Sequence, residues 1–203
     1  MKKKSAAFVT IFLCILLSMC IVDPMITWAG EEMVTVESIN EDISRDGIDR
    51  TIYNIEEDTE KEASFFNDPE FSFYFYKIKL NGQNLTVNGN LNLNAIPIDT
   101  GENGTLIVNG NFTTSEAVSI QEGGTVDIAG NYIQTKNNLY LGTNSRLKVR
   151  DSITFSGTGS MWKAEPTARA IVGGDFLYKT TAGFPTAVTG NNAKWTISGS
   201  VKQ

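Results

Sequence analysis

A seven-residue phrase recurs about every twenty residues from Leu85 onward. Its three clearest copies occupy residues 85–91, 106–112 and 126–132 and read LTVNGNL, LIVNGNF and VDIAGNY. Weaker copies occupy residues 147–153, 170–176 and 195–201. A short period built from strand-forming residues and interrupted by Gly-Asn is typical of a chain wound into stacked coils.

Each repeat has room for three short strands. The first and third positions of the phrase are apolar and are expected to face inward, while the second faces outward. The apolar residue after the Asn position begins a second strand. A third apolar pair precedes the next phrase, at Ile96/Ile98, Val118/Ile120 and Leu139/Leu141. The glycine of the phrase suits a corner that needs a positive φ or a close backbone approach.

We therefore predict an all-β fold over residues 71–203, a single-stranded right-handed parallel β-helix (β-solenoid) with about six coils of ~20 residues. An antiparallel sandwich or barrel is the main alternative. Matching positions of successive repeats are chemically alike, as at Leu85, Leu106, Val126 and Leu147, at Val87, Val108, Ile128 and Val149, and at Asn90, Asn111 and Asn131. Stacked coils explain this likeness and predict that the asparagine amides form a hydrogen-bonded ladder.

Residues 1–29 are predicted to be a signal peptide. Residues 2–4 are lysines, residues 6–22 carry no charge, and Ala29-Gly30 offers a cleavage site. An uncleaved membrane anchor is the alternative, because this apolar stretch is near the lower length limit for a spanning helix. We expect the protein to be secreted or displayed at the cell surface, with membrane contact through this segment alone.

Residues 30–70 form an acidic segment that differs from the remainder. Residues 31–70 hold fourteen Asp or Glu against three basic residues, whereas residues 71–203 hold eight against eleven. High charge and low hydrophobicity favour a flexible, poorly structured leader, and a cap or a calcium-attracting patch is the alternative. Residues 71–80 (FSFYFYKIKL) are predicted to be a strand whose aromatic side chains plug the open end of the core, with sugar binding as the alternative.

The lack of histidine and the position of the two cysteines exclude several kinds of catalytic and metal site. Histidine is absent, and Cys14 and Cys20 both lie in the predicted signal peptide. We therefore expect no Ser-His-Asp triad, no common zinc site, no thiolate chemistry and no disulfide in the exported chain. No cofactor and no metal is predicted.

The outward face of the first strand is the natural place to look for chemistry. Stacking makes Asp127 and Lys148 vertical neighbours and predicts an exposed ion pair. Secreted β-helix polysaccharide lyases use aspartates for Ca²⁺ and a basic residue on such a face, and the candidates for this role here are Asp127, Arg146, Lys148, Arg150 and Asp151. One or two carboxylates are too few for a calcium site of six to eight oxygens, so we expect no catalytic residue.

The Gly-Asn and Gly-Asp phrases resemble those of secreted bacterial right-handed β-solenoid proteins of the adhesin-like and surface-filament group. The resemblance covers residues 78–203 and implies a non-catalytic extracellular or wall-associated scaffold that presents loops and polar sheet faces to a polymer or protein. It carries over no functional residue. A polysaccharide-acting enzyme, of the lyase or glycosidase type, is the alternative.

The expected partners follow from charge and from the chain's last strand. Without residues 1–29, which hold three lysines and one aspartate, the net charge is −8, and no basic stripe is evident, so nucleic acid is not expected. Exposed Asn, Thr and Ser suit a carbohydrate or a cell-envelope protein. The last strand ends at Lys202-Gln203 with little polar capping, so either the long loops at residues 157–169 and 179–194 cover this end or the end self-associates.

Overall fold

The computed structural model describes residues 43–45, 48–157, 161–179 and 192–202. The predicted signal peptide and the acidic residues up to 42 lie outside the described residues. Among those that are described, no helix combines the length and the apolar character required to cross a membrane.

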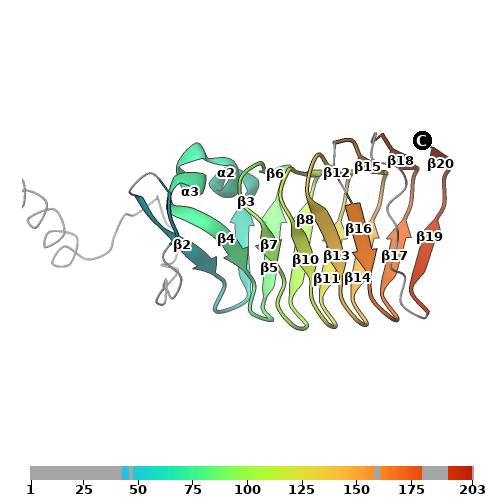
Figure 1. Ribbon diagram of the computed structural model, residues 1–203, viewed down its shortest axis with the longest axis horizontal. Helices are drawn as coiled ribbons and strands as arrows, with labels where there is room; N and C mark the ends of the chain where they lie inside the picture. Colours follow the sequence, from blue (N-terminus) through green and yellow to red (C-terminus); the bar gives the residue numbers. More distant parts are fainter. Residues whose placement is uncertain (1–42, 46–47, 158–160, 180–191, 203) are drawn as a thin grey trace, which may run out of the picture. The chain divides into compact units, whose positions relative to one another are not determined.

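The chain forms an all-β parallel β-solenoid of about six turns of ~21 residues, from residue 51 to 202 (Figure 1). Most turns contribute one strand to each of three sheets, and the first turn has no strand in sheet 3 among the described residues. Sheet 1 contains, in spatial order, β1 (Ile43–Arg45), β2 (Ile48–Asn54), β4 (Phe75–Lys79), β7 (Ile98–Asp99), β10 (Val118–Ile120), β13 (Asn138–Leu141) and β16 (Met161–Ala164). Sheet 2 contains β3 (Thr59–Glu62), β5 (Asn84–Asn88), β8 (Thr105–Asn109), β11 (Thr125–Ile128), β14 (Arg146–Val149), β17 (Arg169–Val172) and β19 (Lys194–Ile197). Sheet 3 contains β6 (Leu91–Leu93), β9 (Phe112–Thr114), β12 (Tyr132–Gln134), β15 (Ile153–Phe155), β18 (Phe176–Tyr178) and β20 (Val201–Lys202).

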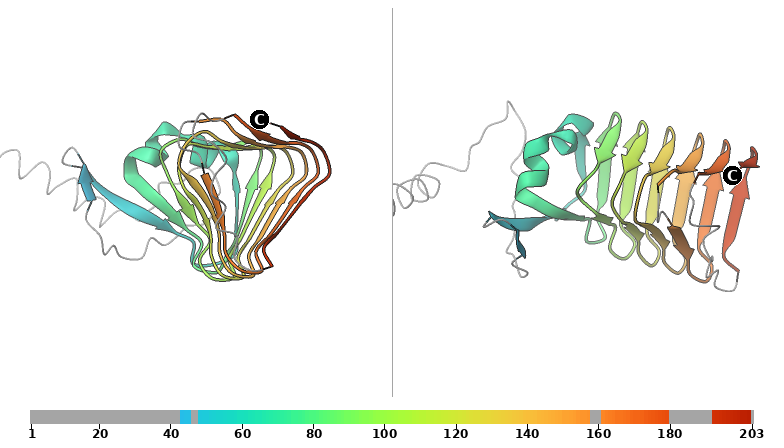
Figure 2. Two further views of the ribbon diagram at one scale, coloured as in Figure 1. Left: turned by 45° about the vertical axis from the view of Figure 1, so that its right-hand side comes forward. Right: turned by 45° about the horizontal axis from the view of Figure 1, so that its top comes forward.

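The predicted like-on-like stacking is confirmed residue by residue. Val87 pairs with Val108, and Val108 with Ile128, in parallel strands. These three side chains are 0% exposed. The coils are stacked along one axis (Figure 2). Within each strand buried positions alternate with more exposed ones, so the coils enclose a continuous apolar column and turn polar positions outward.

The predicted asparagine ladder forms at the corner between sheets 2 and 3. The backbone N–H of Asn111 donates to Asn90 Oδ1 at 2.9 Å, and that of Asn131 donates to Asn111 Oδ1 at 2.8 Å. The ladder continues through polar residues that replace asparagine in later coils: Ser152, Asp175 and Ser200. One side-chain oxygen per coil therefore satisfies a corner amide that no strand reaches.

The glycines beside the ladder are required for two different reasons. Gly89 has a φ of +103°, which L-residues with a side chain rarely adopt. At Gly110 the reason is space, because a Cβ there would lie 2.3 Å from the carbonyl oxygen of Gly89. Close stacking of corner backbones thus excludes a side chain at Gly110 even though its φ is ordinary.

The boundary expected at residue 71 is wrong, because the solenoid begins about twenty residues earlier. Strand β2 pairs in parallel with β4, and β3 pairs in parallel with β5. Residues 51–70 are therefore part of the first coil and not a poorly structured leader. In β3 the acidic residues Glu60 and Glu62 occupy the exposed positions, so the charge that suggested disorder lies on the solvent side of a strand.

The strand expected over residues 71–80 is also partly wrong. Asp68 accepts a hydrogen bond from Glu70 N at the start of α3 (Pro69–Tyr74), and Pro69 occupies the first turn. This capping favours a short helix, so β4 begins only at Phe75. Helix α2 (Ala63–Asn67) precedes α3, and both lie at the N-terminal end of the coils (Figure 1).

Aromatic side chains from these elements fill the N-terminal end of the core, as predicted. Phe71 is 5% exposed, and its ring lies 5.2 Å from Tyr53, 5.2 Å from Phe66 and 4.8 Å from Phe75 between centroids. The C-terminal end differs. Val201 occupies the position of Phe176 one coil later, and its exposure is 55% compared with 3%. Of the predicted covering loops, residues 179–194 fall mostly outside the described residues.

Candidate functional surfaces

The sequence-predicted ion pair on sheet 2 is present. Lys148 Nζ lies 2.7 Å from Asp127 Oδ2, and the two residues are directly paired in β14 and β11. The side chains are 56% and 37% exposed. An ion pair this open to water contributes only about 0.2–1 kcal/mol.

The other three candidates, Arg146, Arg150 and Asp151, form no ion pair with Asp127 or Lys148 among the described residues. Arg150 follows β14 and is exposed, and its backbone N–H donates to Ile128 O at 2.9 Å. Asp151 stands at the corner in place of the glycine of the phrase, and its N–H donates to Gly130 O at 3.2 Å. Within the described ranges, no group of three Asp, Glu, His or Cys residues is placed to hold a metal ion.

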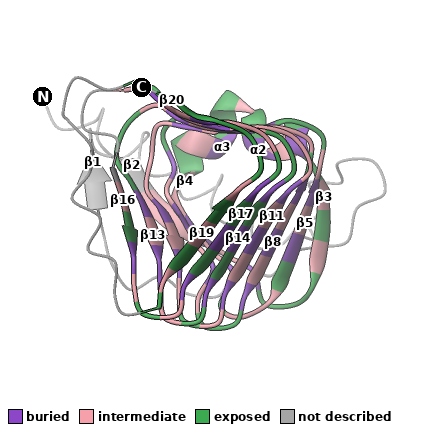
Figure 3. Ribbon diagram, turned by 90° about the vertical axis from the view of Figure 1, so that its right-hand side faces the viewer, coloured by how far each residue is buried: buried purple, intermediate pink, exposed green. Residues whose placement is uncertain are grey.

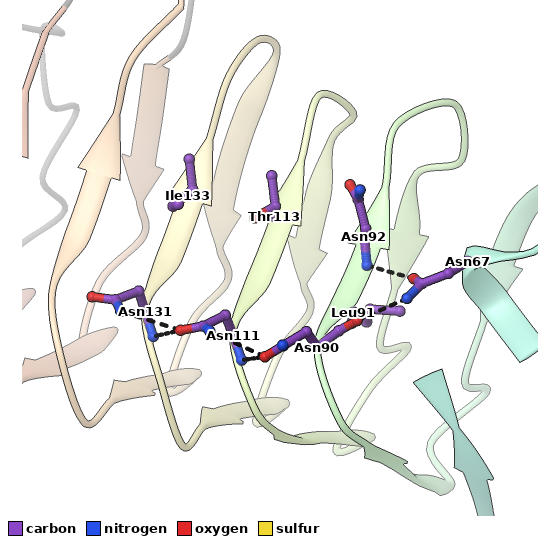
Figure 4. Close-up of a pocket in the computed structure, with 8 residues that line it drawn as sticks. All are labelled: Asn67, Asn90, Leu91, Asn92, Asn111, Thr113, Asn131 and Ile133. Carbon is purple, nitrogen blue, oxygen red and sulfur yellow. Dashed lines mark hydrogen bonds between the residues drawn. The ribbon is translucent and has the colours of Figure 1, made fainter. Parts of the chain in front are cut away.

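A polar groove runs along the asparagine ladder on the outer side of sheet 3 (Figure 4). Its volume is about 480 Å³. It is lined by Asn67, Asn90, Leu91, Asn92, Asn111, Thr113, Asn131 and Ile133. Asn92, Thr113 and Ile133 come from equivalent positions of β6, β9 and β12, so the groove crosses successive coils.

Asn67 closes the N-terminal end of this groove by imitating a strand. Its Nδ2 donates to Asn90 O at 2.8 Å, and its Oδ1 accepts from Asn92 N at 2.7 Å. Helix α2 thereby covers the edge of β6 with one carboxamide. Asn67 and Asn92 were not predicted as site residues, because neither occupies the ladder position of the phrase.

The groove offers hydrogen-bonding groups beyond those that the ladder uses. Asn111 Nδ2 donates to Asn90 Oδ1 at 3.0 Å, and Asn131 Nδ2 donates to Asn111 Oδ1 at 3.1 Å. A carboxamide nitrogen carries two hydrogens, so each of these residues keeps a second N–H. Fixed amide donors at one-coil spacing suit a ligand with repeated hydroxyl or carbonyl groups.

A second groove of about 310 Å³ lies at the corner between sheets 1 and 2, lined by Lys79, Asn81, Asp99, Gly101, Glu102 and Gln121. Lys77 Nζ lies 2.9 Å from Asp99 Oδ2 at its side. Burial raises the pKa of Asp99, but hydrogen bonds from Gly101 N–H and from Lys77 outweigh this effect, so the pKa lies below its ordinary value. Asp99 therefore acts as a fixed anion that organises the corner.

Sheet 2 also carries a column of cations, which the sequence analysis missed. Arg146 pairs with Arg169, and Arg169 with Lys194, so the three occupy one position in successive coils. All three are exposed, and Figure 3 shows exposed positions along β14, β17 and β19 in this view of the C-terminal coils. The expectation of no basic stripe is therefore wrong. Each cation stands immediately before a phrase copy, and aligning that position would have revealed it.

Comparisons of the chain with protein-family models, with curated proteins and with solved structures gave no match. The parallel β-solenoid of about six turns is therefore established from the chain's own geometry.

Proposed function

We propose that this protein is a secreted or cell-surface, non-catalytic scaffold that presents polar sheet faces to a carbohydrate polymer or a cell-envelope protein. The observation that supports it is the groove beside the asparagine ladder. It is polar, it lies on strands of fixed spacing, and it extends over several coils. A rigid row of amide groups matches a partner that is itself periodic.

The arrangement of the candidate catalytic residues favours a scaffold over an enzyme. Asp127 and Lys148 neutralise each other on an exposed face, which accounts for both side chains as an ordinary surface ion pair. Among the described residues, the ion pair of Asp127 and Lys148 includes neither Arg150 nor Asp151. A polysaccharide lyase or glycosidase would need charged groups that converge on one sugar ring.

Binding through the groove is tested with an array of purified neutral and acidic polysaccharides. Thr113→Trp places a large ring in the groove without touching the ladder, and we expect it to weaken binding at least about tenfold because polar contacts are displaced. Thr154→Trp is the matched control, since Thr154 is equivalent to Ile133 one coil further along and does not line the groove. Equal binding by wild type and Thr113→Trp would contradict the groove as the binding surface.

Catalysis is tested on the same polysaccharides with and without Ca²⁺. We expect no new unsaturated or reducing ends from the wild-type protein. Ends that form with wild type and disappear in Arg150→Ala would replace the scaffold proposal with the enzyme. Export is tested by fractionating the producing cells, where we expect the protein outside the cytoplasmic membrane.

A further inference from the structure

The outer side of sheet 2 becomes strongly basic in its last three coils. Arg146, Lys148 and Arg150 stand on or directly after β14, Arg169 stands on β17, and Lys194 stands on β19. We call these five residues the basic face. All five are exposed. Successive coils are roughly 4.8 Å apart. The backbones of Arg146, Arg169 and Lys194, which are paired in neighbouring strands, are therefore separated by about this distance from one coil to the next.

The charges of Arg146, Arg169 and Lys194 are expected to destabilise the free protein. Like charges directly opposite each other on neighbouring strands repel. Lys148 is neutralised by Asp127, but no ion pair of the described residues involves Arg146, Arg169 or Lys194.

The fold does not require a cation at this position. Earlier coils have Asn84, Thr105 and Thr125 there, in the same strand register. Because neutral side chains occupy this position in the earlier coils, the strands do not need a cation there. The stacked cations are available to bind an external anion.

An apolar residue lies within the basic face. Ile171 follows Lys148 in the outward column of sheet 2, and it is 51% exposed. Thr196 follows it in the next coil. A flat face that combines cations, an exposed aliphatic side chain and a hydroxyl matches the chemistry of a sugar ring that carries acidic groups.

We propose that the basic face binds a linear acidic polysaccharide, with its anionic groups along the column of Arg146, Arg169 and Lys194. The proposal rests on the proposed function as a polymer-binding scaffold and names the polymer class. Nucleic acid fits less well. Single strands bind on aromatic platforms, whereas the outward positions of β14, β17 and β19 carry Arg, Lys, Ile and Thr.

The test compares two triple variants with the same change in charge. In the column variant, Arg146, Arg169 and Lys194 are each changed to Gln. In the control variant, Lys79, Lys136 and Lys179 are changed to Gln, and these residues are outside sheet 2. The probes are labelled oligogalacturonate, neutral dextran fragments and a DNA oligonucleotide of matched charge, measured by fluorescence anisotropy at low and moderate salt.

We expect wild type to bind oligogalacturonate in preference to dextran and DNA, with affinity falling as salt rises. Losing three exposed charge contacts should weaken binding about tenfold or more in the column variant, while the control variant stays within about twofold of wild type. Thermal stability gives an independent readout. Removing stacked like charges should leave the melting temperature of the column variant equal or higher at low salt, whereas a structural role predicts a decrease.

Several results would overturn the proposal. The proposal is refuted if both triple variants weaken binding equally or if wild type does not bind oligogalacturonate. It is also refuted if wild type binds DNA more tightly than oligogalacturonate. The two proposals fail separately. Cleavage of the bound oligogalacturonate refutes the non-catalytic scaffold but leaves the basic face as its binding surface. Loss of oligogalacturonate binding alone leaves binding of other polysaccharides in the groove beside the asparagine ladder unaffected.

Discussion

The two ends of the solenoid differ in how far the described residues cover the core. At the N-terminal end, α2 and α3 bring aromatic rings into the core, and Phe71 is 5% exposed. Lys61 lies in β3 with its ammonium 5.5 Å from the ring centroid of Phe65, and such a charge at an edge discourages pairing with another strand. At the C-terminal end, Val201 is 55% exposed. A repeating coil therefore needs separate capping chemistry at its start, and the phrase itself does not supply it.

The ends also differ in charge. Residues 48–70 hold eight acidic and two basic residues, whereas residues 161–202 hold five basic and two acidic residues. The acidic excess is therefore in the first coil, and the basic excess is in the last coils. The aromatic cap and the basic face are thus separated along the axis.

The largest effect should come from removing the centre of the aromatic cap. Phe71→Ala should lower the free energy of unfolding by about 3–5 kcal/mol, because it empties a site enclosed by four other rings. Phe73→Ala is the control in the same helix, since Phe73 is 45% exposed and should cost within about 0.5 kcal/mol. Urea unfolding followed by circular dichroism measures both. Similar losses would mean that the cap is not a packed part of the core.

Most of the coil geometry could be predicted from the sequence because each coil repeats the same inward and outward positions. Val87, Val108 and Ile128 needed only alignment of the phrase, and the ladder from Asn90 to Asn131 followed from the same alignment. The vertical contact of Asp127 with Lys148 was predictable for that reason too. Residues at the same position of successive repeats are therefore vertical neighbours in the structure.

The first coil could not be found in this way because it lacks the phrase. Thr59 and Lys61 stand where later coils have Leu85 and Val87, so the hydrophobic alternation is lost although the backbone pairing remains. The groove was missed for a related reason. Asn67 reaches it from a helix, and its contacts with Asn90 and Asn92 depend on tertiary structure that no repeat describes.

One core column of sheet 2 differs in burial between the middle of the solenoid and its C-terminal end. Ile128 and Ile197 occupy equivalent positions of sheet 2, but Ile128 is 0% exposed and Ile197 is partly exposed. Ile128→Ala should cost about 2–5 kcal/mol because it leaves a cavity. Ile197→Ala should cost about 1 kcal/mol, since the site is open on one side.

Tryptophan fluorescence sharpens this comparison. In the described part of the chain, Trp162 and Trp195 lie in the last coils, with ring centroids 4.5 Å apart. Ile197→Ala should therefore shift the fluorescence transition more than the circular dichroism transition, whereas Ile128→Ala should shift both equally. Equal costs for the two variants would show that the last coil is as well packed as the middle.

Three equivalent turn residues in the last coils have a positive φ. Thr167 has a φ of +63°, and the equivalent residues one coil before and after it, Asn144 and Asn192, also have positive φ. A β-branched residue is strained in this region, and asparagine tolerates it. Thr167→Asn should therefore raise the free energy of unfolding by about 0.5–1 kcal/mol.

Thr125→Asn serves as the control, because Thr125 lies in a regular strand and its replacement should be mildly destabilising. A loss of stability in Thr167→Asn would show that the hydrogen bond from Asn144 N to Thr167 Oγ1, at 3.1 Å, outweighs the backbone strain.

The smallest effects concern two carboxylates that anchor the terminal coils. The backbone N–H and then the side-chain amide of Asn84 hold the pKa of Asp58 below its ordinary value of 3.8. A hydrogen bond from Lys202, and then the Ser200 N–H, lower the pKa of Asp175 in the same way. A lowered pKa contributes stability above the ordinary value that is lost as the pH falls through the folded value. Both anchors should therefore weaken below about pH 4.

Salt separates the two anchors, because Asp58 is held by neutral groups and Asp175 by a cation. Amide hydrogen exchange of Asn84 and Ser200, whose N–H groups donate to these carboxylates, reports each end locally. Both amides should lose protection on acidification, and Asp58→Asn and Asp175→Asn should each abolish the change at their own end. At 1 M salt the Debye length falls to about 3 Å, so protection at neutral pH should decrease at Ser200 and persist at Asn84. Equal salt sensitivity at both amides would mean that the two ends are held by the same kind of interaction, contrary to the contrast drawn from their structures.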